Sequence, residues 1–346
     1  MLRRRHIQFC LIGLLLLCAT TLHAQASLDK VRVVLTPFLN NAPMMIADAE
    51  GFFKDAGIEL EYVKLPDTVD ASALAMALKG DIDVFSGFVT PGAYNAIERG
   101  ANLRVVADSG YTAPDACAYW SFILPKGTDP ATFDVASLKG KHVAVPQGVT
   151  QYYLSKLLEP AGLTLDDVTS DNIPAANRVP ALDSGSVAAV WLSEPTLTSV
   201  QLVEDVQLWV TSAELAPNAE LSVLFYGDTM LQRSDDLPVR FLTAYIRGSR
   251  QTNEGPTERN LDILSPALNI PRDLLGQMCW DNFSVDGAVH TDSLVGYMNW
   301  LYKQGQIDAV LDVDQFYDPS FTQAANALLP EVTPEASAEM TAEAGS

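Results

Sequence analysis

The sequence predicts an α/β protein built as two similarly wound lobes. Short apolar runs typical of buried strands alternate with segments of helical pattern, which indicates sheets of parallel strands with helices on both faces. The alternation runs from residue 31 to residue 107 and starts again near residue 121. About 320 residues follow a predicted leader, which is more than one ordinary core holds. We therefore expect two domains.

The first cycle opens with an apolar run that ends at Thr36-Pro37. Pro43 then stands at an early helical position, where its missing N–H leaves no bond unmade. Gly51 and Gly57 interrupt the helical pattern that follows, and alternating apolar and polar residues mark the next strand. The predicted elements are strands 31–35, 58–63, 82–85 and 103–107 and helices 43–49, 71–78 and 91–99.

The second cycle has the same organisation, and a helical region follows it. The predicted strands are 122–124, 142–145, 168–173, 188–192 and 206–210, and the predicted helices are 150–159, 179–183 and 195–203. Further helices are predicted at 238–251, 257–264, 272–280 and 292–302, and we expect them to pack on the first lobe. The first lobe thus comprises 27–120 and 226–330, and the second lobe 121–225. Residues 331–346, rich in Ala, Glu, Thr and Ser, are expected to form a disordered acidic tail.

Residues 1–26 are predicted to be a cleaved signal peptide. A basic stretch, Arg3–Arg5, precedes an apolar run, Cys10–Leu17, that is too short to span a bilayer. Ala24-Gln25-Ala26 has the small residues of a cleavage site, so the mature chain would begin at Ser27. We therefore expect a periplasmic protein.

The alternative to cleavage is a membrane anchor, either an uncleaved leader or a lipid attached to Cys18. Leu17 stands before that cysteine, where a small residue is normally needed. Cleavage and release are therefore favoured. No later segment is apolar over a length that crosses a membrane, so no stable membrane insertion is expected.

The charge excludes some partners. The chain has 43 Asp and Glu against 22 Lys and Arg, a formal charge of −21. Loss of the three arginines of the leader takes this to −24. Nucleic acid and anionic lipid surfaces repel such a chain. Net charge speaks to solubility and not to a pocket, so it leaves the ligand open.

Cys117 and Cys279 remain after the leader is removed. An oxidising compartment permits a disulfide between them, whereas two buried free thiols are the alternative. Neither cysteine lies in a metal-ligand pattern, and we expect neither a metal nor a cofactor.

Five segments, in order along the chain, resemble the nitrate/sulfonate/taurine and thiamine-pyrimidine binding proteins. In that family a helix is followed by "GFF…GI", and the second lobe opens with "L-K-G-K-x-V-A-V". One departure is Ala188, where the family usually has Asp. The segments are Asn41–Leu60, Leu78–Val84, Leu138–Val145, Leu182–Pro195 and Ile307–Ala324, which contains Phe316-Tyr317-Asp318.

The resemblance implies a periplasmic-binding-protein fold of the second type, in which two crossover strands join two α/β lobes around a ligand cleft. The crossovers would lie near residues 119–124 and 221–227. It also implies a monomer that delivers a small-molecule ligand to an ABC-type permease and ATPase. Closure of the lobes would be the mechanism, because contacts from both lobes exist together only in the closed form.

Ligands of open α/β sheets bind beyond the carboxyl ends of strands, where helix N-termini offer free N–H groups. This rule gives candidates in both lobes, and Trp120 near the first crossover could stack on a ring. The candidates are Phe38, Asn40, Asn41, Ser86, Gly87, Thr90, Ser109, Tyr111 and Trp120, and in the second lobe Gly148, Thr150, Gln151, Tyr152, Ser193 and Glu194.

Several candidates also have a structural interpretation. Thr90 and Thr150 are typical helix caps, and Tyr152 and Trp120 are typical of packing. Glu194 could accept N–H groups of a ligand or cap its own turn, and ligand contact is slightly favoured.

The candidate loops contain no Arg or Lys. A sulfonate or nitrate would have to rely on helix N-termini and hydroxyls, although anion sites made of backbone N–H groups exist. Glu194 with Tyr and Trp neighbours better suits a flat heterocycle with amino groups, such as a thiamine-type pyrimidine or a flavin-like ring. Only His142 and His290 remain after the leader, and no nucleophile elbow or phosphate-binding loop is present. The family includes a pyrimidine-synthesising enzyme with a cysteine-rich motif, which this chain lacks. We expect a binding protein and not an enzyme; a ligand sensor stays open.

Overall fold

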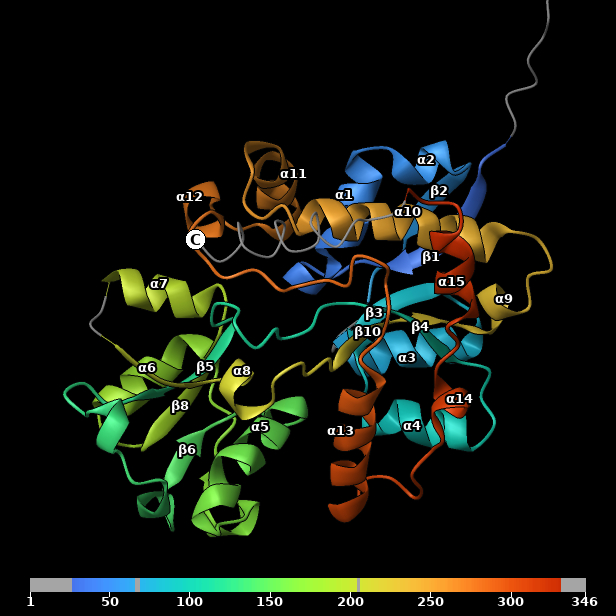
Figure 1. Cartoon of the computed structure of the whole chain (residues 1–346). Coiled ribbons are helices and arrows are strands. Elements are labelled where there is room, and N and C mark those ends of the chain that lie inside the picture. Colours follow the sequence, from blue (N-terminus) through green and yellow to red (C-terminus); the bar gives the residue numbers. More distant parts are fainter. Residues whose placement is uncertain (1–26, 66–68, 204–205, 331–346) are drawn as a thin grey trace, which may run out of the picture.

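The computed structural model describes residues 27–330 except 66–68 and 204–205, and it shows two α/β lobes beside each other (Figure 1). The predicted signal peptide and acidic tail lie outside the described residues. Each lobe is built around one five-stranded sheet. Among the described residues, no helix combines the length and apolar character needed to cross a membrane.

The first sheet has the strand order β2-β1-β3-β10-β4. β1 pairs with β2 and β3 in parallel, whereas β10 runs antiparallel to both β3 and β4. Its strands are β1 (Asp29–Val34), β2 (Ile58–Tyr62), β3 (Val84–Phe88), β4 (Arg104–Asp108) and β10 (Ser222–Tyr226).

The second sheet repeats this arrangement in the order β7-β6-β8-β5-β9. β6 pairs with β7 and β8 in parallel, and β5 runs antiparallel to β8 and β9. Its strands are β5 (Trp120–Leu124), β6 (His142–Ala144), β7 (Thr169–Ser170), β8 (Ala189–Ser193) and β9 (Gln207–Thr211).

Both sheets are mixed, whereas the sequence pattern indicated parallel strands. The two strands that arrive from the other lobe, β5 and β10, enter each sheet in the opposite direction to their neighbours. The structure also places β10 in the first sheet, although the predicted second lobe ran to residue 225. The apolar run of β10 does not itself indicate which of two sheets it joins, because either would bury it.

Helices cover both sheets, and the C-terminal helices pack on the first lobe as predicted. The second lobe carries α5 (Val149–Leu158), α6 (Ala175–Asp183), α7 (Thr196–Val203) and α8 (Ser212–Leu215). The first carries α1 (Ala42–Ala49), α2 (Phe52–Asp55), α3 (Val69–Lys79), α4 (Pro91–Glu98), α9 (Asp228–Leu231), α10 (Leu237–Thr252), α11 (Glu258–Leu268), α12 (Arg272–Leu275), α13 (Thr291–Lys303), α14 (Val313–Phe316) and α15 (Ser320–Asn326).

The contact between α1 and α10 depends on Gly248. A Cβ at this position would lie 2.0 Å from the carbonyl oxygen of Pro43 and 3.1 Å from the Cβ of Ala47. The absence of a side chain therefore lets the two helices approach backbone to backbone. This contact holds the start of α1, which follows directly on Asn40 and Asn41.

The predicted helix 272–280 ends early, at Leu275, and the chain continues without regular structure to α13. Trp280 donates from its indole nitrogen to the Leu275 carbonyl oxygen at 2.9 Å. Cys279 forms a disulfide with Cys117, which decides between the two predicted states of these cysteines. The bond ties the segment after α12 to the linker between β4 and β5.

Candidate functional site

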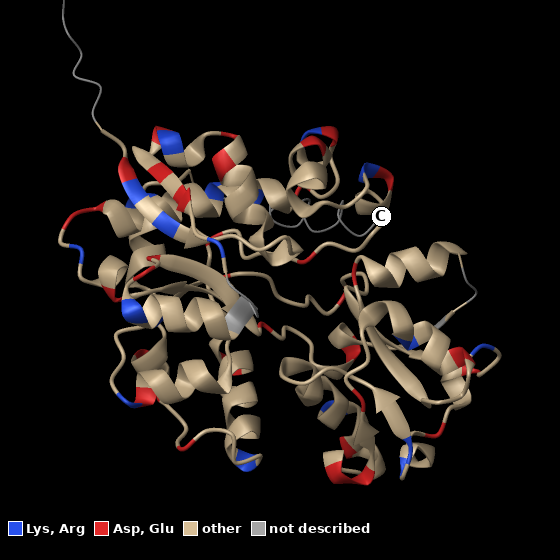
Figure 2. Cartoon of the chain, turned by 180° about the vertical axis from the view of Figure 1, so that it is seen from behind, with Lys and Arg blue, Asp and Glu red and all other residues tan. Residues whose placement is uncertain are grey.

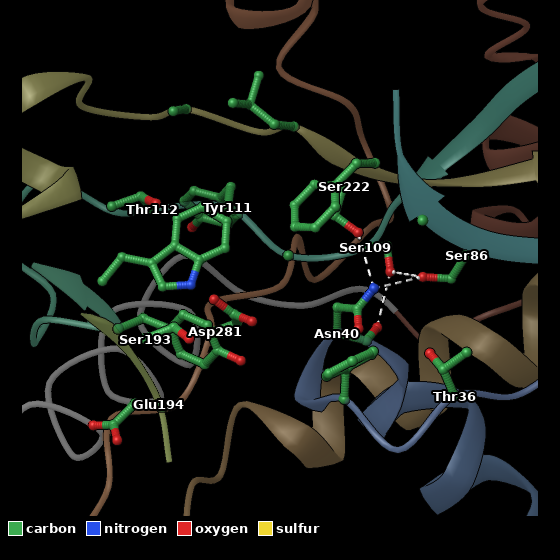
Figure 3. Close-up of a pocket in the computed structure, with 18 of the residues that line it drawn as sticks. Thr36, Asn40, Ser86, Ser109, Tyr111, Thr112, Ser193, Glu194, Ser222 and Asp281 are labelled. Carbon is green, nitrogen blue, oxygen red and sulfur yellow. Dashed lines mark hydrogen bonds between the residues drawn. The ribbon is translucent and has the colours of Figure 1, made fainter. Parts of the chain in front are cut away.

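A cavity of about 310 Å³ lies between the lobes, near the point where the chain crosses from one to the other (Figure 3). Both lobes and the segment after α12 contribute side chains. The cavity is lined by Thr36, Phe38, Asn40, Ser86, Gly87, Phe88, Ser109, Gly110, Tyr111, Thr112, Tyr119, Trp120, Tyr153, Ser193, Glu194, Ala219, Leu221, Ser222 and Asp281.

Most of the candidates from the first lobe line this cavity. They come from the loop before α1, from β3 and from the chain that leaves β4. The candidates that the structure brings together are Phe38, Asn40, Ser86, Gly87, Ser109, Tyr111, Trp120, Ser193 and Glu194. The candidates that do not line it are Asn41, Thr90, Gly148, Thr150, Gln151 and Tyr152.

Two of the candidates outside the cavity belong to the first lobe. Asn41 is buried, and its amide nitrogen donates to Thr36 Oγ1 at 2.9 Å. Thr90 is the N-cap of α4 and accepts from the backbone N–H of Ala93 at 3.3 Å. Thr90 thus has the capping role that was its alternative interpretation.

The remaining four lie at the start of α5. Thr150 donates its hydroxyl to the carbonyl oxygen of Pro146, and Gln151 donates to the same oxygen at 3.0 Å. Tyr152 packs on α13, with its ring centre 5.4 Å from that of Tyr297. The next residue, Tyr153, lines the cavity instead, because successive residues of a helix point about 100° apart.

The polar wall of the first lobe is a network of amide and hydroxyl groups (Figure 3). The amide nitrogen of Asn40 donates to Ser86 Oγ at 3.1 Å and to Ser222 Oγ at 3.0 Å. Ser109 Oγ donates to the Asn40 carbonyl oxygen at 2.8 Å and lies 2.5 Å from Ser86 Oγ. Most donors of this wall therefore already have acceptors within it.

Aromatic rings line another part of the cavity. The ring centre of Trp120 lies 5.8 Å from Phe88, 5.7 Å from Tyr119 and 5.5 Å from Tyr153. Phe38 is 54% exposed, as expected for a ring at the mouth of an open cavity. These rings offer flat apolar surfaces that suit an aromatic ligand.

Glu194 lines the cavity, but its carboxylate already accepts three hydrogen bonds. Oε2 accepts from the backbone N–H of Thr198 at 3.1 Å, in the first turn of α7. Oε1 accepts from Thr198 Oγ1 at 2.7 Å and from the backbone N–H of Cys279 at 3.0 Å. Burial raises the pKa of Glu194, and these donors oppose that rise. The carboxylate thus caps α7 and links the second lobe to the segment after α12.

Asp281 is a cavity residue that the sequence did not indicate. It lies in an irregular segment and not at a strand end, so the rule that ligands bind beyond strand ends does not select it. Burial raises the pKa of its carboxyl group to about 7. Its position two residues after Cys279 was the one available signal, since a disulfide to Cys117 brings this segment to the crossover.

Two fully buried carboxyl groups lie where the chain leaves β4 and where it enters β10. Asp108, at the end of β4, accepts through Oδ2 from the N–H of Ser284 at 3.0 Å and of Gly110 at 3.4 Å. Glu220, just before β10, accepts through Oε2 from the N–H and Nδ1 of His290. Within the described chain, the other oxygen of each carboxyl has no hydrogen-bond partner. Burial raises both pKa values, and the charge of Glu220 raises that of Asp108 further.

The described residues contain no group of three or more His, Cys, Asp or Glu side chains arranged to hold a metal ion. Acidic residues occur in both lobes, with Lys and Arg among them (Figure 2).

Comparison with known proteins gives a family and a fold. A family model described as NMT1/THI5 like matches residues 39–259, more than half of the chain. A search of curated protein sequences found no match.

Several solved structures are similar over most of their length. The periplasmic aliphatic sulphonate binding protein SsuA from Escherichia coli has a TM-score of 0.65 at 17% identity, covering 84% of this chain and 93% of its own. The periplasmic nitrate-binding protein NrtA from Synechocystis has a TM-score of 0.62 at 16% identity, and the match covers 87% of this chain and 89% of its own. The desulfurization enzyme DSZB has a TM-score of 0.61 at 16% identity, and the match covers 87% of this chain and 99% of its own. These likenesses confirm the two-lobed fold of type II periplasmic binding proteins.

Proposed function

The chain belongs to the NMT1/THI5-like family, and on that premise we propose that it is the extracytoplasmic solute-binding protein of an ABC importer. Its ligand is a small organic nutrient held between the lobes. A flat heteroaromatic compound with amino groups, such as a thiamine-type pyrimidine, is the favoured class.

The composition of the cavity lining supports this class of ligand. Six aromatic residues line about 310 Å³, and among the described lining residues none is Lys or Arg. A sulfonate or nitrate usually requires a cationic partner or a set of free N–H donors. Here the amide and hydroxyl donors of the first lobe mostly serve one another. Aromatic stacking is the interaction that this lining supplies best.

Delivery depends on lobe closure. The cavity takes side chains from both lobes, so a ligand that touches both favours the closed arrangement. A permease that contacts both lobes then distinguishes the loaded protein from the empty one. Secretion of the mature chain from Ser27 is part of this proposal, and intact-mass measurement of the exported protein tests the cleavage site.

Two measurements test the ligand class. Mass spectrometry identifies the small molecule that co-purifies with the protein. Calorimetric titration then compares a 4-aminopyrimidine with taurine and nitrate, while small-angle scattering reports closure. Binding of the pyrimidine with a decrease in the radius of gyration supports the proposal. Tighter binding of taurine or nitrate would establish an anion-binding protein instead.

Anion binding is the second candidate, and the fold shared with sulfonate- and nitrate-binding proteins favours it. An enzyme is a third candidate, because DSZB shows that the fold also occurs in an enzyme. Incubation with pyridoxal phosphate and iron tests for pyrimidine synthesis, and formation of a pyrimidine would overturn a purely binding role. An adjacent receptor gene, with no permease and ATPase genes beside it, would favour a sensor.

A further inference from the structure

Asp281 is held in place from both sides. Two residues before it, Cys279 is bonded to Cys117. On the other side, the carbonyl oxygen of Asn282 accepts from the backbone N–H of Tyr111 at 2.9 Å. The carboxyl group is therefore carried by backbone fixed to the linker between the lobes. A group positioned in this way loses little conformational freedom when it binds a ligand.

The Asp281 carboxyl group has no hydrogen-bond donor among the described residues, and burial is the cause of its raised pKa. Gly110 leaves the space beside it, since a Cβ there would lie 3.3 Å from the Asp281 Cβ. Glu194 differs, because Thr198 and Cys279 supply three donors to it. Figure 3 shows Asp281 with Ser193 and Glu194 on one side and the network around Asn40 on the other. Asp281 is therefore the carboxyl group that is free to bind a ligand.

We infer that Asp281 is the counter-ion for a positively charged nitrogen group of the ligand, which makes the ligand an aromatic cation. This rests on the proposed function and narrows it. A carboxylate that is partly shielded from water and has no partner is costly, and a cation in the cavity supplies the missing charge and donors. The rings of Tyr119, Trp120 and Tyr153 add faces that attract a cation.

The other titratable groups near Asp281 do not replace it. Tyr119 and Tyr153 face it, and burial raises the pKa of both hydroxyl groups, so they stay neutral near pH 7. Glu194 is occupied by its own donors, the N–H and hydroxyl of Thr198 and the N–H of Cys279. Ionisation of Asp281, with a pKa of about 7, is therefore the step that prepares the empty cavity for a cation.

The test compares two probes of the same shape by calorimetry: benzamidinium, which stays cationic across the range, and neutral benzamide. For the wild type at pH 8 we expect benzamidinium to bind at least about 30-fold more tightly. Asp281→Asn should abolish this preference. Asp273→Asn, on the exposed face of α12, removes the same formal charge and should keep it. Lowering the pH from 8 to 5 should weaken benzamidinium binding to the wild type and leave Asp281→Asn unchanged.

Asp281→Asn keeps the shape and removes no hydrogen bond, so it should fold; Asp281→Ser is the second variant, and thermal unfolding checks both. Equal affinity for the two probes in the wild type, or an unchanged preference in the folded variants, would overturn the inference. Binding of a neutral or anionic nutrient with lobe closure would also overturn the inference. That result would leave the proposed solute-binding function intact. Failure of every co-purified or titrated solute to bind would contradict the proposed function itself.

Discussion

Gly248→Ala is the substitution for which local sequence and tertiary structure predict opposite results. Alanine favours a helix interior over glycine by about 1 kcal/mol, so helix propensity alone predicts a more stable protein. In the structure, a Cβ on Gly248 would lie 2.0 Å from the carbonyl oxygen and 2.9 Å from the carbonyl carbon of Pro43. These are backbone atoms of α1, which cannot rotate away as a side chain could. The clash therefore predicts destabilisation.

The magnitude follows from the displacement that is needed. Cβ contacts shorter than 3.0 Å essentially do not occur, so α1 and α10 must separate by at least 1 Å locally. Overpacking of a close contact costs about 1–3 kcal/mol, and a clash with backbone lies at the upper end. After the gain in helix propensity, we expect a net loss of about 2 kcal/mol in the free energy of unfolding. Because Asn40 lies three residues before Pro43, ligand affinity should also fall.

Urea unfolding followed by circular dichroism measures the change, with equal slopes required of the two proteins. Gly276→Ala is the control, because a Cβ there meets its nearest neighbour, the Arg272 carbonyl oxygen, at an ordinary 3.5 Å. The control should stay within about 0.5 kcal/mol of the wild type. A Gly248→Ala protein as stable as the wild type, or more so, would refute the close backbone contact.

Three further predictions concern the crossover region. Asp108→Asn mimics the protonated carboxyl group. Because the pKa of Asp108 is higher in the folded protein than in the unfolded chain, the free energy of unfolding of the wild type should fall as pH rises from about 4. The variant should lack that fall, so its stability relative to the wild type should increase with pH in urea unfolding; a pH-independent difference would contradict the raised pKa. Replacing Cys117 and Cys279 together with Ser should lower the free energy of unfolding by about 2–5 kcal/mol, because the bond closes a long loop; an unchanged thermal midpoint in reductant would argue against it. Glu194→Gln should lower the free energy of unfolding by about 1–3 kcal/mol, since an amide N–H would face the donors of Thr198 and Cys279. Unaltered urea unfolding would show that the cap is dispensable.

Local pattern determined most of the secondary structure. Pro43 at an early helical position, Pro91 after Thr90 and Gly51 indicated where helices begin and end, and the structure has helices there. These signals act within a few residues, so they do not depend on the rest of the chain. Local pattern failed beyond Leu275, where the chain leaves the helix to form the disulfide.

The strand-end rule found the first-lobe side of the cavity. Asn40 follows β1, Ser109 follows β4, and Ser86 lies within β3. These three strands belong to one sheet, and the strand ends of one sheet lie together whatever surrounds them. The same rule placed Thr150 and Gln151 in the site, but they bond to Pro146 away from the cavity. Strand order within a lobe does not fix how the two lobes face each other.

The sequence by itself thus determined the two α/β cycles, the family and the polar side of the cavity, because each rests on residues that are near in the chain or on one sheet. The tertiary structure alone decided the antiparallel entry of β5 and β10, the backbone contact at Gly248 and the place of Asp281. Each of these joins segments that are far apart in the chain. Their meeting depends on packing of the whole molecule, which no local pattern encodes.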